Sequence, residues 1–277
     1  MAQIFHGGPK VTEVFYDVYN AIEPGCAVVA EHAETGRLMG SCFYHPRKHH
    51  MALGIMNVHP NYFGMGVGRA LLEYIIDLTE KKGLKSLRLT QSALNLDSFS
   101  LYSKAGFVPR CADQDMFVKV PAEGLGDKVP GTERVRDATL ADVPAMAALE
   151  MDISGVSREQ NYRFCIENSV GFFHTSVFQN AQGGLDGFLI SSGHPALNML
   201  GFGVCRTDEQ AIALLQTELN VNRGRTSVFL VPVEREQIVR QMYAWGARNC
   251  ELHFCQVRGE FKPFNGINLP TFILETA

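Results

Sequence analysis

A glycine-rich turn between a predicted strand and a predicted helix is the first feature of this sequence that could do chemistry. The segment NVHPNYFGMGVGRALL, residues 57–72, contains Gly64, Gly66 and Gly68. Glycines let the backbone approach a pyrophosphate closely, their N–H groups can point at its oxygens, and the first turn of a helix adds positive potential. The turn therefore predicts a binding site for a phosphate-containing cofactor.

The turn alone does not identify the cofactor, because a tight turn before a packed helix has the same glycine pattern. A dinucleotide-binding fingerprint, and with it an oxidoreductase, requires an acidic residue at the end of the next strand, about 20 residues further on. The next predicted strand ends in Thr90 and Gln91 instead. This difference disfavours a dinucleotide.

A second motif, NLDSFSLYSKAGF at residues 95–107, follows the first across a predicted helix and strand. Together the two motifs resemble the GNAT acetyltransferase superfamily, whose patterns are V-x-P-x-x-(Q/R)-G-x-G-x-(G/A) and N-x-x-(S/A)-x-x-(L/F)-Y-x-(K/R)-x-G-F. The resemblance covers residues 26–120 and implies acetyl-CoA as the co-substrate. The matching residues are Val58, Pro60, Gly64, Gly66, Gly68, Asn95, Ser98, Leu101, Tyr102, Lys104, Gly106 and Phe107.

The resemblance also implies a role for each matched segment. The backbone of Met56, Asn57 and Val58 would hold the pantetheine arm, and a fixed N–H there would stabilise the oxyanion. Tyr102 would protonate the leaving thiolate as general acid while the acceptor amine attacks the thioester directly. The other cofactor-binding residues fall in the pyrophosphate loop and the second motif: Gly64, Met65, Gly66, Val67, Gly68, Arg69, Asn95, Ser98 and Lys104. For Tyr102, the alternative is a helix tyrosine packed on the sheet.

The general base is less defined. His59 follows the predicted cofactor strand, and a histidine with a pKa near neutrality is a natural base. A water chain is the alternative. His45, His49 and His50 lie in the segment HPRKHH, which resembles a solvated loop. These histidines lack ligand spacing on a defined element and no cysteine or carboxylate completes them, so we expect no metal site.

Two departures from the family pattern leave a second function open. Phe63 stands at the Q/R position of the first motif, where a polar side chain usually lies near the phosphates. The opening strand with the R-x-A-x-x-x-D signature is missing, so either the sheet begins one strand short or another segment fills its place. The alternative to an active acyltransferase is therefore a CoA-binding pseudoenzyme that acts as a sensor or scaffold.

The elements around the motifs predict an α+β fold of two GNAT-like domains, each a mixed, mostly antiparallel twisted sheet flanked by helices. Apolar periodicity predicts strands at 26–31, 38–44, 52–58, 86–90 and 115–120, with helices from about Arg69 to Gly83 and over 94–104. The predicted domains are 1–121 for acetyl-CoA, a Pro- and Gly-rich linker at 122–131, and a degenerate second domain at 132–277.

The second half repeats the order of elements but not the chemistry. VRDATLADVPAMAALE matches the opening strand–helix signature of the superfamily, whereas GFGVCRTDEQAIALL stands where the phosphate turn should recur. Tyr243 occupies the position of Tyr102 without a glycine cradle before it, and we expect it to pack in the core. We expect this half to shape the acceptor pocket, cover a sheet edge or form a homodimer surface, and its C-terminal tail to pack on the protein.

Composition limits the partners. Hydrophobic residues make up 46%, charged residues 19%, and the net charge is −4. This balance indicates no nucleic acid partner, and no apolar run predicts a membrane span. The seven cysteines form no CxxC pair, which predicts free thiols and a cytoplasmic protein. The expected reaction is acetyl transfer from acetyl-CoA to a primary amine of a small molecule or peptide, through a tetrahedral intermediate.

Overall fold

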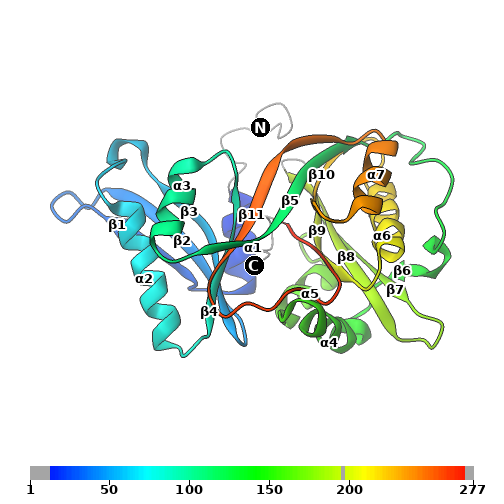
Figure 1. Ribbon diagram of the computed structural model, residues 1–277, viewed down its shortest axis with the longest axis horizontal. Helices are drawn as coiled ribbons and strands as arrows, with labels where there is room; N and C mark the ends of the chain where they lie inside the picture. Colours follow the sequence, from blue (N-terminus) through cyan, green and yellow to red (C-terminus); the bar gives the residue numbers. More distant parts are fainter. Residues whose placement is uncertain (1–12, 195–196, 272–277) are drawn as a thin grey trace.

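One twisted sheet runs through both halves of the chain and carries helices on its faces (Figure 1). The computed structural model describes residues 13–194 and 197–271. The elements of the first half are α1 (Glu13–Ile22), β1 (Ala27–Glu31), β2 (Leu38–Pro46), β3 (His50–Val58), α2 (Val67–Lys81), β4 (Ser86–Ser92), α3 (Leu96–Lys104) and β5 (Val108–Lys119). The predicted α+β class with a mostly antiparallel sheet is confirmed.

The second half has the same alternation of strands and helices. Its elements are β6 (Val135–Asp137), α4 (Val143–Ser154), α5 (Glu159–Glu167), β7 (Phe173–Gln179), β8 (Leu185–His194), β9 (Leu197–Cys205), α6 (Asp208–Val221), β10 (Thr226–Pro232), α7 (Glu236–Ala244), β11 (Arg248–Gly259) and β12 (Ile267–Leu269). Three 3-10 turns lie at Pro60–Tyr62, Thr132–Arg134 and Leu140–Asp142. Residues 122–131 contain no helix or strand, although the predicted domain boundaries stay a prediction.

The last long strand of each half lies inside the other half's part of the sheet. The strand order is β1-β2-β3-β4-β11-β5-β10-β9-β8-β7-β6, with β12 paired to β9. β11 therefore lies between β4 and β5, and β5 lies between β11 and β10; Figure 1 shows β5 and β11 side by side between the two halves. The sheets that we predicted for two domains are thus joined into one continuous ladder, and each half completes the other's sheet.

Helices bury the two faces of this sheet. On the first half, Leu71 and Ile75 of α2 pack with Leu87 and Leu89 of β4. On the second half, α6 and α7 pack on one face, while α4 and α5 pack on the other. α1 joins the latter cluster through Val18, which is 2% exposed. The N-terminal helix is therefore buried against the second half, which ties the halves together on the face as well as along the sheet.

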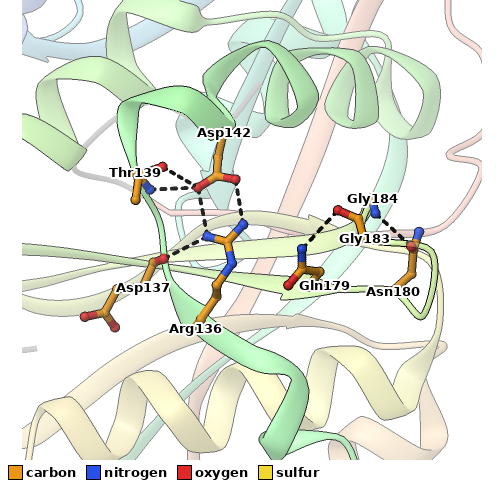
Figure 2. A network of polar contacts seen from close by, with 8 residues as sticks. All are labelled: Arg136, Asp137, Thr139, Asp142, Gln179, Asn180, Gly183 and Gly184. Atoms are coloured by element: carbon orange, nitrogen blue, oxygen red, sulfur yellow. Dashed lines mark hydrogen bonds and ion pairs between the residues drawn. The ribbon is translucent and has the colours of Figure 1, made fainter.

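The start of the second half shows why its opening signature predicts a strand followed by a helix. Arg136 on β6 donates two hydrogen bonds to Asp142, at 2.8 and 2.9 Å (Figure 2). The Asp142 carboxylate also accepts from the N–H and hydroxyl of Thr139. The Arg136 guanidinium holds the pKa of Asp142 at about 2. One carboxylate thus fixes the turn and links β6 to the helix that follows.

Several elements differ from the sequence-based expectations. β5 begins at Val108, seven positions before the predicted start at Asp115, because its exposed first residues lack alternating hydrophobicity. Neither α1 nor β11 was expected. In the second half, β6 is the opening strand and pairs with β7 at the edge of the sheet. In the described part of the first half, no strand lies beyond β1 in the same way, so β1 is itself the edge strand. The described sheet therefore begins one strand short in the first half, as one of the two alternatives proposed.

The prediction of a solvated loop at HPRKHH is wrong for three of its residues. His45, Arg47 and His50 are all buried. His45 and Arg47 both contact the carboxylate of Glu23, just after α1. The sequence pattern does not reveal an ion pair between distant segments. The charged segment HPRKHH therefore resembled a solvent-exposed loop.

Candidate functional site

β3 and β4 pair only at one end and then diverge. Their parallel ladder joins His50 to Ser86, Met51 to Leu87 and Ala52 to Arg88. Beyond it, β3 keeps its antiparallel partner β2, with Met56 opposite Cys42 and Val58 opposite Gly40. In the described residues, the β4 side of residues 53–58 has no strand partner. Backbone groups of the segment predicted to hold pantetheine are therefore available to an extended ligand.

The predicted pyrophosphate loop leads from β3 into α2 and is open. Gly64 and Gly66 have φ values of 75° and 82°, a region that side chains other than glycine rarely adopt. No atom lies within 4 Å of a Cβ built on either residue. Gly66 caps α2 without a side-chain hydrogen bond, so the first N–H groups of a 15-residue helix are not capped by a side chain. Open backbone N–H groups at a helix N-terminus suit a phosphate group.

Gly68 lies where α2 contacts both β3 and α3, the three elements that carry the predicted site residues. A Cβ added to it would lie 3.5 Å from Val58 on β3 and 3.6 Å from Leu101 on α3. The neighbouring Gly40 on β2 has no such room, since a Cβ there would lie 2.7 Å from the carbonyl oxygen of Asn57. Small residues therefore let α2 approach the end of β3, which places the loop beside the unpaired backbone of β3.

Tyr102 lies in this same assembly. It is 6% exposed, and its ring packs against Phe107 with centroids 5.7 Å apart. Its cluster includes Val67 at the start of α2, with Met56 and Val58 of β3 packed against it. The structure thus brings the candidate acid, the start of α2 and the end of β3 into one cluster. Tyr102 therefore packs on the sheet and also lies near the candidate site.

The other predicted residues of the second motif are more exposed. The Asn95 Oδ1 accepts a hydrogen bond of 3.0 Å from the N–H of Ser98, so Asn95 caps α3. This cap is a structural role that the motif does not reveal. Lys104 is exposed at the last turn of the same helix.

The loop residues around the glycines are also at the surface. Phe63 and Met65 are 67% and 62% exposed. Arg69 pairs with Glu73 at 2.7 Å one turn further along α2, and this hydrogen bond raises the pKa of the guanidinium. The His59 Nδ1 accepts from the N–H of Asn61 at 3.2 Å, so this candidate base caps the 3-10 turn before the loop.

Comparison with known families agrees with this geometry. Residues 4–107 match the family model described as the acetyltransferase (GNAT) family. The matched residues include the glycine-rich loop and the Tyr102 motif of the first half.

Curated relatives match parts of the chain. The UPF0157 protein YqkA of Bacillus subtilis is 31% identical over 103 residues, which are 37% of this chain and 28% of that protein. The [ribosomal protein bS18]-alanine N-acetyltransferase of Escherichia coli is 46% identical over 50 residues, which are 18% of this chain and 34% of that enzyme. The chain thus covers about a third or less of the length of either relative.

Solved structures extend the fold to the whole chain. A putative acetyltransferase from Pyrococcus horikoshii has a TM-score of 0.77 at 13% identity, covering 97% of this chain and 87% of that one. A tandem GNAT protein from the clavulanic acid biosynthesis pathway has a TM-score of 0.60 at 15% identity, covering 89% and 87%. The predicted fold of two GNAT-like units is therefore confirmed.

In the second GNAT-like unit, the chain's own C-terminal segment fills the position that corresponds to the unpaired side of β3. β9 and β10 pair at a single position, Met199 opposite Val228, and then diverge as β3 and β4 do. β12 lies there, with Leu269 opposite Gly203 and Ile267 opposite Cys205. Ile267 and Leu269 are 0% and 1% exposed. The expected packing of the tail is confirmed for residues 267–269.

The first turn of α6, the helix after β9, is also occupied by the protein itself, whereas the first turn of α2 is open. Thr207 and Gln210 form a capping box at the start of α6, so side chains of the protein itself occupy its first N–H groups. The sequence T-x-x-Q could have shown this, because it is a standard helix-start pattern. The strand position of β12, in contrast, has no local signal.

Proposed function

We propose that the first GNAT unit binds acetyl-CoA and transfers its acetyl group to a primary amine. The observation that carries the proposal is the open loop at Gly64 and Gly66, placed between the unpaired backbone of residues 53–58 and the helix of Tyr102. The glycine loop and the start of α2 suit the pyrophosphate, and the extended β3 backbone suits the pantetheine arm.

The residues have separate tasks in this reaction. A backbone N–H in residues 56–58 stabilises the negative oxygen that develops on the thioester carbonyl. The amine nitrogen forms the new C–N bond, the C–S bond breaks, and the thiolate takes a proton from the Tyr102 hydroxyl. The proton that the acceptor ammonium must lose goes to water or to His59. Asn95 and Ser98 hold the start of α3, which orients Tyr102, and Lys104 contributes positive charge on the same helix.

The second unit does not bind acetyl-CoA in this proposal. β12 pairs with the part of β9 that corresponds to the cofactor-binding part of β3, and α6 is capped by Thr207. A pantetheine arm would have to displace a buried strand. We therefore expect one cofactor per chain.

The acceptor is a primary amine of a small molecule or a peptide. The match to an alanine N-acetyltransferase that acts on a ribosomal protein supports an α-amino group as the first acceptor to try. Because that match covers 50 residues, it supports the chemistry of the amine and not a particular protein partner.

Calorimetric titration of the whole chain with acetyl-CoA, with NADH as the control ligand, tests the proposal. We expect one site per chain with micromolar affinity and no binding of NADH. Two sites would contradict the assignment of the second unit, and no binding to the folded protein would contradict the cofactor. Binding without turnover on a panel of amines and peptide N-termini would favour the sensor or scaffold function that Phe63 left open.

A further inference from the structure

Three buried ionisable side chains meet where the two halves exchange strands. Asp115 lies on β5, and Glu251 and His253 lie on β11. One ligand atom from each residue lies within 4.8 Å of the other two. The three residues are 5–7% exposed. Asp115 comes from the first half and the other two come from the second half, so the group exists only in the joined sheet.

The strand register places the three side chains on one face. Glu251 is directly opposite Asp115, and His253 is two residues beyond Glu251 on the same strand. Side chains two apart on a strand point to the same face. The register shifts between Asn249 and Glu251, which leaves Cys250 as the extra residue of a β-bulge. The bulge sets Glu251 opposite Asp115, as bulges do where a side chain must be re-aimed.

The separations between His253 and the two carboxylates are longer than hydrogen bonds. The His253 Nδ1 lies 3.7 Å from an Asp115 oxygen, and its Nε2 lies 3.6 Å from a Glu251 oxygen. Both distances exceed a normal hydrogen bond. Two ligands of a tetrahedral ion with bonds of about 2.1 Å lie about 3.4 Å apart. One imidazole nitrogen and one oxygen from each carboxylate lie within 4.8 Å of one another, so the three side chains would draw closer together around a shared ion. The imidazole gives one nitrogen to an ion and keeps the other for a hydrogen bond, as metal-bound histidines usually do.

The two carboxylates of the group lack a positively charged side chain as partner in the described residues. The Asp115 Oδ1 is buried and accepts no hydrogen bond. In the described ranges, neither Asp115 nor Glu251 has an ion pair with lysine or arginine. Two adjacent buried carboxylates with one imidazole are costly to ionise, and a divalent cation offsets that cost.

We propose that Asp115, Glu251 and His253 bind a divalent transition-metal ion, best matched by Zn²⁺, that fastens the exchanged strands β5 and β11. Two carboxylates and one imidazole are a ligand set that Zn²⁺ accepts, with water as the fourth ligand. Ser92 on β4 donates a hydrogen bond to Glu251 and orients it. This site departs from the sequence-based expectation of no metal, which considered only the histidines near residue 50.

The test uses the whole chain after dialysis against a chelator. We expect calorimetry to detect one Zn²⁺ per chain with micromolar or tighter affinity, no comparable binding of Mg²⁺, and a higher Tm with Zn²⁺. Asp115→Asn and His253→Gln should each weaken binding at least about 100-fold, because loss of an outer-shell partner alone costs roughly 10–100-fold. Ser92→Ala should weaken it by roughly tenfold.

Asp113→Asn is the matched control, since Asp113 lies on the same strand and face, is 4% exposed, and is not part of the group. It should bind Zn²⁺ like the wild-type protein. Cobalt substitution separates this site from the cysteines, because a thiolate ligand gives a charge-transfer band and carboxylate–imidazole ligation does not. Any of three results would overturn the proposal: no Zn²⁺ binding by the folded wild-type protein, unchanged binding in His253→Gln, or a thiolate band. The first and third are measured on the wild-type protein, so the proposal stays testable if a variant fails to fold.

Discussion

Leu269 pairs with Gly203 on β9, the position that corresponds to Met56 on β3. The correspondence follows from the register, because Gly187 pairs with Cys205 at the end of β9 as Gly40 pairs with Val58 at the end of β3. The same strand edge is thus open in the first unit and occupied by the chain itself in the second.

Leu269→Ala should destabilise the protein by about 2–4 kcal/mol, because a buried leucine leaves a cavity when it is truncated. Denaturant unfolding measures the loss, and Leu94→Ala, at a side chain that is 75% exposed, is the control. Acetyl-CoA affinity of the first unit should not change. A loss below about 0.5 kcal/mol would contradict tight packing of β12.

Neither half should fold by itself. β11 takes both of its partners, β4 and β5, from the first half, so a fragment of residues 1–121 leaves β4 without its β11 partner and β5 without both β11 and β10. We expect fragments 1–121 and 122–277 to be insoluble or unfolded when made separately and to form a complex when co-expressed. Circular dichroism and gel filtration measure this, and cooperative unfolding of fragment 1–121 alone would contradict the exchange.

Gly66→Ala should weaken acetyl-CoA binding about tenfold or more, since a side chain at φ 82° strains the loop that presents the N–H groups. Gly83→Ala is a matched control at the other end of α2, with φ 67° and no atom within 4 Å of a Cβ. Both variants should lose about 1 kcal/mol of stability. Equal effects on the Kd of acetyl-CoA would show that strain alone, and not the loop, is responsible.

Tyr102→Phe should lower kcat about 100-fold and leave the Kd of acetyl-CoA unchanged, because only the proton donor is lost. Tyr243→Phe in the second unit is the control. The prediction that Tyr243 packs in the core is wrong, since the residue is 49% exposed, and its hydroxyl donates a hydrogen bond of 3.1 Å to Gln114. We expect no change in kcat for that variant. Steady-state kinetics with the best amine of the panel measure both, and full turnover in Tyr102→Phe would exclude Tyr102 as the acid.

Acid should remove the stabilisation that the contact of Arg136 with Asp142 provides. The pKa of Asp142 is about 2 in the folded protein, below its ordinary 3.8. The stabilisation is therefore complete above about pH 4 and is lost as the pH falls towards 2. Asp142→Asn should be less stable than the wild-type protein at pH 6, and the difference should shrink below pH 4. Urea unfolding measures it, with Asp77→Asn, at an exposed position on α2, as the control.

The sequence by itself determined the local chemistry of the first unit. The order V-x-P then G-x-G-x-G predicts a strand, an open turn and a helix because glycine conformation and helix-start potential are local properties. The structure has β3 ending at Val58 and α2 starting at Val67, two residues before the predicted Arg69. Hydrophobic periodicity in the same way predicted β4 and α3 close to their observed positions.

Only the tertiary structure decided which strands are neighbours. Nothing local in β5 or β11 says that each pairs with the other half, because strand pairing depends on contacts between distant residues. Three other features also depend on contacts between distant residues. They are the pairing of β12 with β9, the burial of His45 against Glu23, and the meeting of Asp115 with Glu251 and His253. A pattern along the chain predicts the face that a side chain occupies, whereas the residue across from it is fixed only when the sheet is assembled.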